Sequence, residues 1–245
     1  GLELGGKAAN IVFADADLDD ALDGVALGTI LNQGEECVAG TRLLVEKSIA
    51  ETFTRKLADR LSRLRVGLPL DPQTDMGAMI HEDHMKAVLA HVETARREGA
   101  DVVAGGMRLT GGIYDKGFFI APTILGKVTP EMSYFREEVF GPVISVTAFE
   151  TVDEAVALAN ATEYGLGNGL WTKDLDKAHQ VSKRLRSGTV WVNTYLDGAP
   201  QMPFGGYKRS GLGRENGREG LIEFMQVKST FFRLGKRAKA LPHAA

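Results

Sequence analysis

Residues 11–45 read IVFADADLDDALDGVALGTILNQGEECVAGTRLLV, and this stretch decides the fold class. The apolar run at 11–13 predicts a short buried strand. Residues 18–31 carry apolar side chains at helical spacing, and Asp15, Asp17 and Asp19 are candidate caps for that helix. A second apolar run at 43–45 predicts another buried strand. Strand, helix and strand in succession indicate an α/β protein with a largely parallel sheet.

The same alternation continues toward the C-terminus. Gly99 is expected to end one of the helices, because glycine readily adopts the left-handed conformation of a helix C-cap. Glycine becomes frequent and periodicity fades between 193 and 217, which predicts a long functional loop. Further helices are predicted at 49–64, 81–98, 152–159 and 218–225, and strands at 102–104, 118–120, 143–149, 190–192 and 227–232.

The composition is ordinary for a globular protein. The 245 residues are 44% hydrophobic and 25% charged, with a formal net charge of -3. This balance offers no basic surface for nucleic acid, and no apolar run is long enough to span a membrane. A single cysteine excludes a disulfide within the chain and favours a cytoplasmic location. His81 and His84 lack a third ligand at zinc spacing, so we expect no metal site.

The single cysteine, Cys37, lies between Gly34 and Gly40, and these glycines permit a tight bend and a close approach of ligand to backbone. A lone cysteine is most often a small buried apolar residue. The neighbouring Glu35 and Glu36 are expected to raise its pKa, which disfavours the reactive thiolate. Spacing and charge alone therefore do not identify Cys37 as a nucleophile.

Four segments, taken in order, change this interpretation. They are Glu-Leu-Gly-Gly-Lys at 3–7, Asn-Gln-Gly-Glu-Glu-Cys-Val-Ala-Gly-Thr-Arg at 32–42, Glu-Glu-Val-Phe-Gly-Pro at 137–142, and Pro-Phe-Gly-Gly-Tyr-Lys at 203–208 followed by Ser210-Gly211. Together they resemble the signature segments of the aldehyde dehydrogenase superfamily, and the resemblance extends from Gly1 to about Gly235. It implies a Rossmann-like three-layer α/β catalytic domain.

The resemblance implies that the enzyme oxidises a small-molecule aldehyde to a carboxylic acid with NAD or NADP. Cys37 would attack the aldehyde carbon to form a thiohemiacetal, with its own backbone amide as one donor to the oxyanion. Loss of hydride would leave a thioester. Glu3 matches the general base that activates the hydrolytic water, a task that suits a carboxylate of raised pKa.

Two further groups of residues follow from the same resemblance. Glu138 matches the carboxylate that binds the nicotinamide ribose, and Phe140 would pack beside the nicotinamide. Leu4 and Gly5 complete the predicted cofactor contacts. Asn193 is expected to support the active-site loop and to take no part in the chemistry. The predicted substrate pocket consists of Glu36, Val38, Asp197, Gly198 and Phe204.

The predicted organisation has three parts. Residues 1–225 form the catalytic domain, 226–235 an oligomerisation strand, and 236–245 a basic, flexible tail. The apolar run at 227–232 would promote aggregation if it remained an unpaired edge strand. Pairing with a neighbouring subunit would prevent this, which agrees with a homodimer or homotetramer. In the family a dinucleotide-binding domain precedes the segment at 3–7, and it carries a second oxyanion donor. We therefore expect residues 1–245 alone to have little dehydrogenase activity.

There are two alternatives, one a related enzyme and the other from a different functional class. An acylating relative would transfer the thioester to coenzyme A, but such relatives generally lack the glutamate that Glu3 matches. A catalytically silent structural or interaction domain is the other alternative. The presence of Cys37, Glu3 and Glu138 together weighs against a silent domain.

Overall fold

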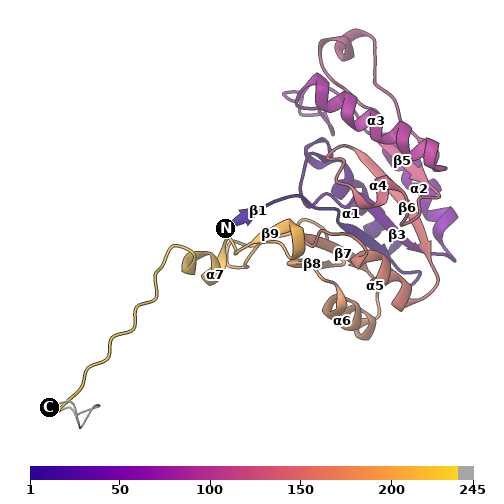
Figure 1. The fold of residues 1–245 in the computed structure, drawn as a ribbon. Coiled ribbons are helices and arrows are strands. Elements are labelled where there is room, and N and C mark those ends of the chain that lie inside the picture. Colours follow the sequence, from indigo (N-terminus) through magenta and orange to yellow (C-terminus); the bar gives the residue numbers. More distant parts are fainter. Residues whose placement is uncertain (237–245) are drawn as a thin grey trace.

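A seven-stranded sheet forms the centre of the computed structural model, which describes residues 1–236 (Figure 1). Within this sheet β4 runs antiparallel to β5, and all the other neighbouring pairs are parallel. The predicted α/β fold with a largely parallel sheet is therefore confirmed. The spatial order of the strands is β4 (Asp101–Ala104), β5 (Thr123–Gly126), β6 (Val143–Phe149), β3 (Arg42–Glu46), β2 (Ala9–Val12), β7 (Gly167–Trp171) and β8 (Thr189–Val192).

Helices cover both faces of the sheet. Successive strand residues point to opposite faces, so a continuous apolar strand needs a helix layer on each side. In β3, Leu43 and Val45 pack with α1 (Leu18–Ile30) and α2 (Ala50–Ser62). Leu44 between them packs into the opposite cluster. That second cluster contains side chains of α3 (Glu82–Glu98), α4 (Ser133–Arg136), α5 (Val152–Asn160) and α6 (Leu175–Arg184).

The helix boundaries follow the polar residues around them. Asp17 caps α1 by accepting a hydrogen bond from the backbone amide of Asp20, and Asp19 and Asp20 place negative charge in the first turn. Gly99 ends α3 in the left-handed conformation, with φ of 107°. Both features agree with the sequence prediction.

Three local predictions differ from the structure. In the predicted strand 118–120 the structure has only an isolated bridge, from Ile120 to Arg108, and β5 begins after Pro122. The strand β7 was not predicted, because two of its five residues are glycines and glycine is not typical of strands. A Cβ at Gly167 would press on Trp191, and one at Gly169 on Tyr195, so tertiary packing dictates glycine there. The helix α6 was also missed, since charged residues fill much of its sequence.

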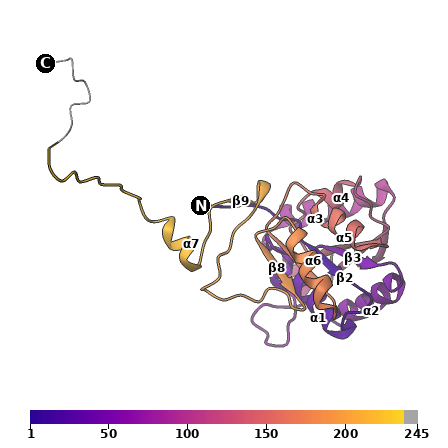
Figure 2. The same ribbon diagram turned by 90° about the horizontal axis from the view of Figure 1, so that it is seen from below.

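The C-terminal part of the chain leaves the main body. A two-stranded sheet of β1 (Leu2–Glu3) and β9 (Gly211–Leu212) precedes α7 (Gly217–Ile222). Beyond α7 the chain extends away from the sheet in both views (Figures 1 and 2). The predicted strand at 227–232 has no strand partner within residues 1–236, and Val227 is 96% exposed. The predicted tail lies outside the described residues, Lys236 excepted.

Arg42 in β3 joins the sheet to two other segments. Its side chain is 1% exposed and stacks on the ring of Phe135. The guanidinium donates to the carbonyl oxygens of Lys7, Leu158 and Ala159 at 2.9, 2.7 and 2.8 Å. These bonds hold the end of α5 and the segment after Gly6 against β3.

Replacing Arg42 by methionine will lower the free energy of unfolding by about 3–5 kcal/mol, because three buried carbonyls lose charged donors. Urea denaturation measures the change. Arg60→Met is the matched control: Arg60 pairs with Asp23 at the exposed surface, so its loss will change stability by at most about 1 kcal/mol. Equal effects of the two substitutions would contradict the assigned role of Arg42.

Candidate active site

Cys37 lies in the loop between α1 and β3. The loop starts with a 3-10 helix, Leu31–Gly34, in which Asn32 and Gln33 adopt the left-handed conformation. Such backbone is rarely populated by non-glycine residues and persists only when its surroundings hold it. Asn32 Nδ2 donates to the carbonyl of Glu35 at 2.9 Å. A Cβ at Gly34 would overlap the carbonyl of Gly141, so this loop packs directly against residues 137–142.

The segment at 3–7 lies between Cys37 and Glu138. A Cβ at Gly6 would overlap the carbonyl oxygen of Cys37, and one at Gly5 would overlap Oε2 of Glu138. The backbone amide of Gly6 donates to Oε1 of Glu138 at 2.9 Å. Both glycines are therefore required by close contact. The contacts join the first three signature segments at one place.

The fourth segment completes this cluster. Glu3 in β1 pairs with Gly211 in β9, and the amide of Leu4 donates to the carbonyl of Ser210 at 2.9 Å. Ser210 is fully buried, and its Oγ accepts from the amide of Gly165 at 2.9 Å. Segments from four distant parts of the chain thus meet at residues 3–7, beside Cys37.

The charged side chains that shift the pKa of Cys37 are acidic. Burial of the half-buried thiol raises its pKa above the ordinary value, and the carboxylates of Glu138, Glu3 and Glu36 raise it further. The expected effect of Glu36 is thereby confirmed. Glu35 points elsewhere: its Oε1 accepts from the amide of Ile80 at 3.1 Å and lies 3.6 Å from His84.

Removing the charge of Glu138 will make Cys37 more reactive. Glu138→Gln keeps an acceptor for Gly6 but lowers the pKa of Cys37, so more thiolate is present at pH 8. Alkylation by iodoacetamide should accelerate by roughly three- to ten-fold, since one pKa unit changes the thiolate fraction up to ten-fold. Glu150→Gln, in an exposed pair with Lys47, serves as control. Equal rates for all three proteins would contradict this electrostatic account.

The two predicted functional carboxylates also have raised pKa values. Burial, and then the charge of Glu215, raises the pKa of Glu3. Burial raises the pKa of Glu138, while the amide of Gly6 and the charge of Lys7 oppose that rise. For Glu3, a raised pKa suits the predicted general base, because such a carboxylate accepts a proton more readily near neutral pH.

The predicted cofactor residues form an accessible surface beside Glu138. Phe140 is 36% exposed and has a positive φ of 59°. His84 Nε2 lies 2.7 Å from the carbonyl oxygen of Phe140 and fixes that backbone. Leu4 is half-exposed. Within the described residues, Oε2 of Glu138 has no hydrogen-bond donor, so this oxygen fits the hydroxyls of a ribose.

The predicted substrate residues are only partly gathered. Cys37 and Phe204 pack against the cluster that contains Val38, Trp191 and Tyr195. Oε2 of Glu36 is buried and has no hydrogen-bond partner in residues 1–236. Asp197 instead bonds within its own loop, to Thr194 through its carboxylate and to Trp191 through its carbonyl at 2.6 Å. The space around Gly198 is open.

Three structurally important residues were not predicted from the sequence. Tyr195 donates to the carbonyl of Val38 at 2.7 Å and thereby holds the residue next to Cys37 in place. Lys7 and Arg42 lie inside signature segments but are buried, an unusual place for basic residues. The side-chain amide of Asn193 exchanges two hydrogen bonds of 2.9 Å with the backbone of Thr172, which tie the residue after β8 to the residue after β7. Its support of the active-site loop stays a prediction.

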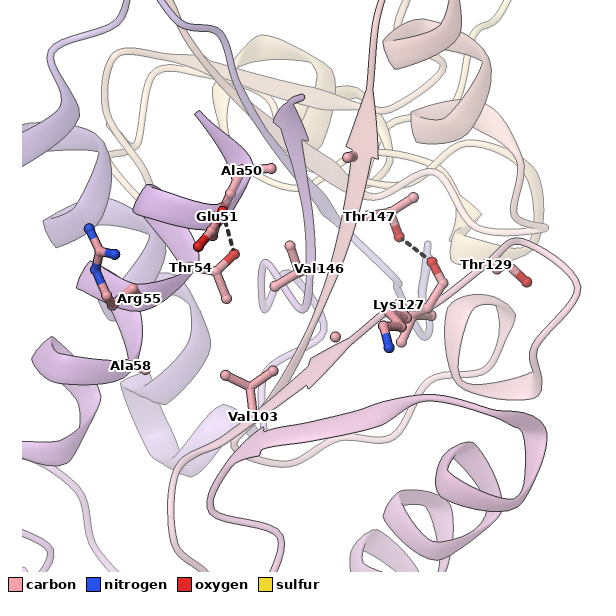
Figure 3. Close-up of a pocket in the computed structure, with 13 residues that line it drawn as sticks. Ala50, Glu51, Thr54, Arg55, Ala58, Val103, Lys127, Thr129, Val146 and Thr147 are labelled. Carbon is pink, nitrogen blue, oxygen red and sulfur yellow. Dashed lines mark hydrogen bonds between the residues drawn. The ribbon is translucent and has the colours of Figure 1, made fainter. Parts of the chain in front are cut away.

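A separate groove lies away from the candidate site. A groove of about 780 Å³ runs between α2 and strands β4 to β6, and Figure 3 shows Thr54, Val103 and Val146 around it. None of the predicted site residues lines this groove. In the part of the chain that the structure describes, no three His, Cys, Asp or Glu side chains are placed to hold a metal ion. No helix within residues 1–236 combines the length and apolar character needed to cross a membrane.

Comparison with known proteins identifies the family. The model of the aldehyde dehydrogenase family matches residues 1–230. The chain belongs to the aldehyde dehydrogenase family. A betaine aldehyde dehydrogenase of Vibrio vulnificus is 42% identical over 234 residues, covering 96% of this chain and 48% of that protein. One of Brucella anthropi is 43% identical over 237 residues, with the same coverage of each protein.

Solved aldehyde dehydrogenases share the fold. The NAD-dependent aldehyde dehydrogenase of Sinorhizobium meliloti superposes with a TM-score of 0.95 at 47% identity, covering 98% of this chain and 47% of that one. A betaine aldehyde dehydrogenase of Staphylococcus aureus in complex with NAD+ superposes with a TM-score of 0.90 at 42% identity, covering 91% and 44%. This chain therefore spans about half the length of the relatives it matches.

Proposed function

We propose that this chain is the thiol-bearing catalytic half of an NAD-dependent aldehyde dehydrogenase, in which Cys37 is the nucleophile. The observation that carries the proposal is the meeting of four distant segments beside this one half-buried cysteine. The membership of the aldehyde dehydrogenase family supports it. NAD is the proposed cofactor because the solved relatives include NAD+ complexes.

The proposed reaction proceeds through covalent catalysis at Cys37. The thiolate of Cys37 adds to the aldehyde carbon, and the carbonyl oxygen becomes an oxyanion that accepts from the backbone amide of Cys37. Bound NAD supplies the acceptor for the hydride that leaves this carbon, and the carbonyl re-forms as a thioester. Glu3 then removes a proton from water as the water oxygen attacks the thioester. The carbon–sulfur bond breaks, releasing the carboxylic acid and restoring the thiolate.

The residues beside Glu138 are those that would hold the cofactor. The free oxygen of Glu138 suits the ribose hydroxyls, and the exposed face of Phe140 suits the nicotinamide ring. Leu4 and Gly5 line the same place, where a larger residue than glycine would displace the Glu138 carboxylate. Glu138 would thereby hold the cofactor beside the segment that contacts Cys37.

A cationic aldehyde is the substrate class that this site favours. The charged side chains that act on Cys37, namely Glu3, Glu36 and Glu138, are all acidic. Several relatives are betaine aldehyde dehydrogenases, and the name denotes a substrate with a quaternary ammonium group. Val38 and Phe204 would then form the apolar wall of the pocket.

The test compares betaine aldehyde with 3,3-dimethylbutanal, its neutral counterpart of the same shape, in the complete gene product. NADH formation is followed by absorbance. We expect kcat/KM to favour betaine aldehyde by at least about ten-fold, since a nearby opposite charge contributes on the order of 1–2 kcal/mol. Oxidation of both aldehydes at equal rates would contradict the substrate class. Oxidation of neither aldehyde, nor of a wider panel, would contradict the activity.

Residues 1–245 alone are proposed to have little dehydrogenase activity. The chain spans about half the length of the relatives it matches. The resemblance to the family implies a second oxyanion donor that residues 1–245 do not contain. Losing one such donor typically lowers turnover by about 100- to 1000-fold. A titration that shows tight NAD binding to the isolated chain would contradict this proposal.

The C-terminal segment is proposed to make a homodimer or homotetramer. Val227, Phe231, Phe232 and Leu234 are almost fully exposed, and so apolar an extended segment is a template for pairing with another chain. Ending the protein after Met225 should therefore convert the oligomer to a monomer, as measured by light scattering. An unchanged oligomer would contradict this role. A cytoplasmic location stays a prediction from the single cysteine.

A further inference from the structure

Lys7 is buried at the centre of the candidate site. It is 3% exposed, and its Nζ has no hydrogen-bond partner within the described residues. Lysine is almost never fully buried unless its charge is compensated. Burial lowers the pKa of Lys7 well below its ordinary value, and so does the charge of Arg42, while Glu138 and Glu137 oppose this effect. Burial of this ammonium group costs desolvation free energy, which the contacts of the rest of the side chain must offset.

The contacts of Lys7 join three parts of the site. Its carbonyl oxygen accepts from Arg42 Nε, which lies in the strand that follows the Cys37 loop. Its Nζ stands 3.8 Å from the ring centroid of Tyr134, which belongs to the helix directly before Glu138. Its neighbour Gly6 donates to Oε1 of Glu138. The side chain therefore ties the Gly5-Gly6 backbone to α4, the helix that ends two residues before Glu138.

Lys7 has no room to bind a ligand. The cavity it lines together with Arg42, Tyr164 and Asn168 has a volume of only about 10 Å³. A space of that size admits one water molecule at most. Lys7 therefore acts on the reaction only through other residues.

The charged and titratable groups around Lys7 favour an effect on Glu138. Glu137 and Glu138 attract its ammonium group, and Arg42 repels it. His91 in α3 also feels its charge, which lowers the pKa of His91 after the larger effect of burial. In return, the charge of Lys7 opposes part of the rise that burial causes in the pKa of Glu138.

We propose that Lys7 is the positioning residue that holds Glu138 ready for the cofactor, by fixing the Gly5-Gly6 backbone to α4 through the ring of Tyr134. This inference rests on the proposed role of Glu138 in binding NAD. The ionised carboxylate accepts from a ribose hydroxyl only if Gly6 keeps it in place. Lys7 supplies both the anchor and the compensating charge.

The test is a double-mutant cycle on equilibrium NAD affinity, measured by quenching of protein fluorescence in the complete gene product without substrate. Lys7→Met keeps the length and packing of the side chain and should weaken NAD binding roughly ten-fold, within the range of couplings between neighbouring residues. Glu138→Gln should weaken it by roughly 10- to 100-fold, as expected for a lost charged hydrogen bond. The double variant should bind no worse than Glu138→Gln alone.

Tyr134→Phe is the matched control for a purely structural effect. It retains the ring under Lys7 but removes the hydroxyl that donates to the carbonyl of Val143, so it should lower the melting temperature and leave NAD affinity unchanged. Wild-type affinity should also fall as pH rises through the pKa of Lys7, whereas Lys7→Met should show no such step.

Three results would overturn the inference. They are wild-type affinity in Lys7→Met, additive losses in the double variant, and a loss of affinity in Tyr134→Phe that matches its loss of stability. A wild-type protein that neither binds NAD nor oxidises an aldehyde would instead overturn the proposed function, and the role of Lys7 with it.

Discussion

Replacing Cys37 by serine will lower aldehyde oxidation by about 10,000-fold or more, as the loss of a covalent nucleophile does in other enzymes. The hydroxyl of serine is far less acidic than the thiol, and no basic residue acts on position 37 to activate it. NADH formation by the complete gene product under saturating aldehyde and NAD measures the loss. NAD affinity should stay within about three-fold of wild type, because Glu138 and Phe140 are untouched.

The stability of the Cys37→Ser variant separates chemistry from folding. Cys37 is half-buried at the edge of the apolar cluster, so the exchange of sulfur for oxygen should change the free energy of unfolding by about 1 kcal/mol or less. Retention of substantial activity in a folded variant would show that Cys37 is not the nucleophile.

Replacing Glu3 by glutamine will abolish turnover but spare the first half of the reaction. Without a general base for water, hydrolysis of the thioester should slow by about 100- to 10,000-fold. Hydride transfer needs no such base, so each active site should still release one NADH. Rapid mixing should therefore show a burst of NADH equal to the enzyme concentration, followed by almost no steady rate.

Glu150→Gln supplies the control for the loss of one carboxylate, because Glu150 pairs with Lys47 at the exposed surface. It should turn over at the wild-type rate with no isolated burst. If Glu3→Gln lost the burst together with the steady rate, Glu3 would act before hydride transfer, and its assignment as the hydrolytic base would be wrong.

Local sequence patterns predicted the layers of the fold well, because burial imposes its own periodicity. Leu43, Leu44 and Val45 form a continuous apolar run since both faces of the sheet are covered by helices. Asp17 and Gly99 mark helix ends through their own backbone preferences. Gly167 and Gly169, by contrast, are dictated by the rings of Trp191 and Tyr195. No local pattern contains that information.

The candidate site shows the same division. The signature residues Cys37, Glu3 and Glu138 were predicted through resemblance, and the structure brings their segments together, although their catalytic roles stay predictions. The pairing of Glu3 with Gly211 joins residues that are far apart in the sequence, so no local sequence pattern predicts it. The burial of Lys7 contradicts the usual behaviour of lysine, so it became visible only from its tertiary contacts.

The central claim is that a thioester forms on Cys37, and peptide mass mapping tests it most directly. Glu3→Gln protein is mixed with aldehyde and NAD, quenched in acid during the burst and digested. The proposed mechanism predicts that the peptide containing Cys37 carries the mass of one acyl group, and that no adduct appears when NAD is omitted. An unmodified Cys37 after a full burst of NADH, or an acyl group on another residue, would contradict it.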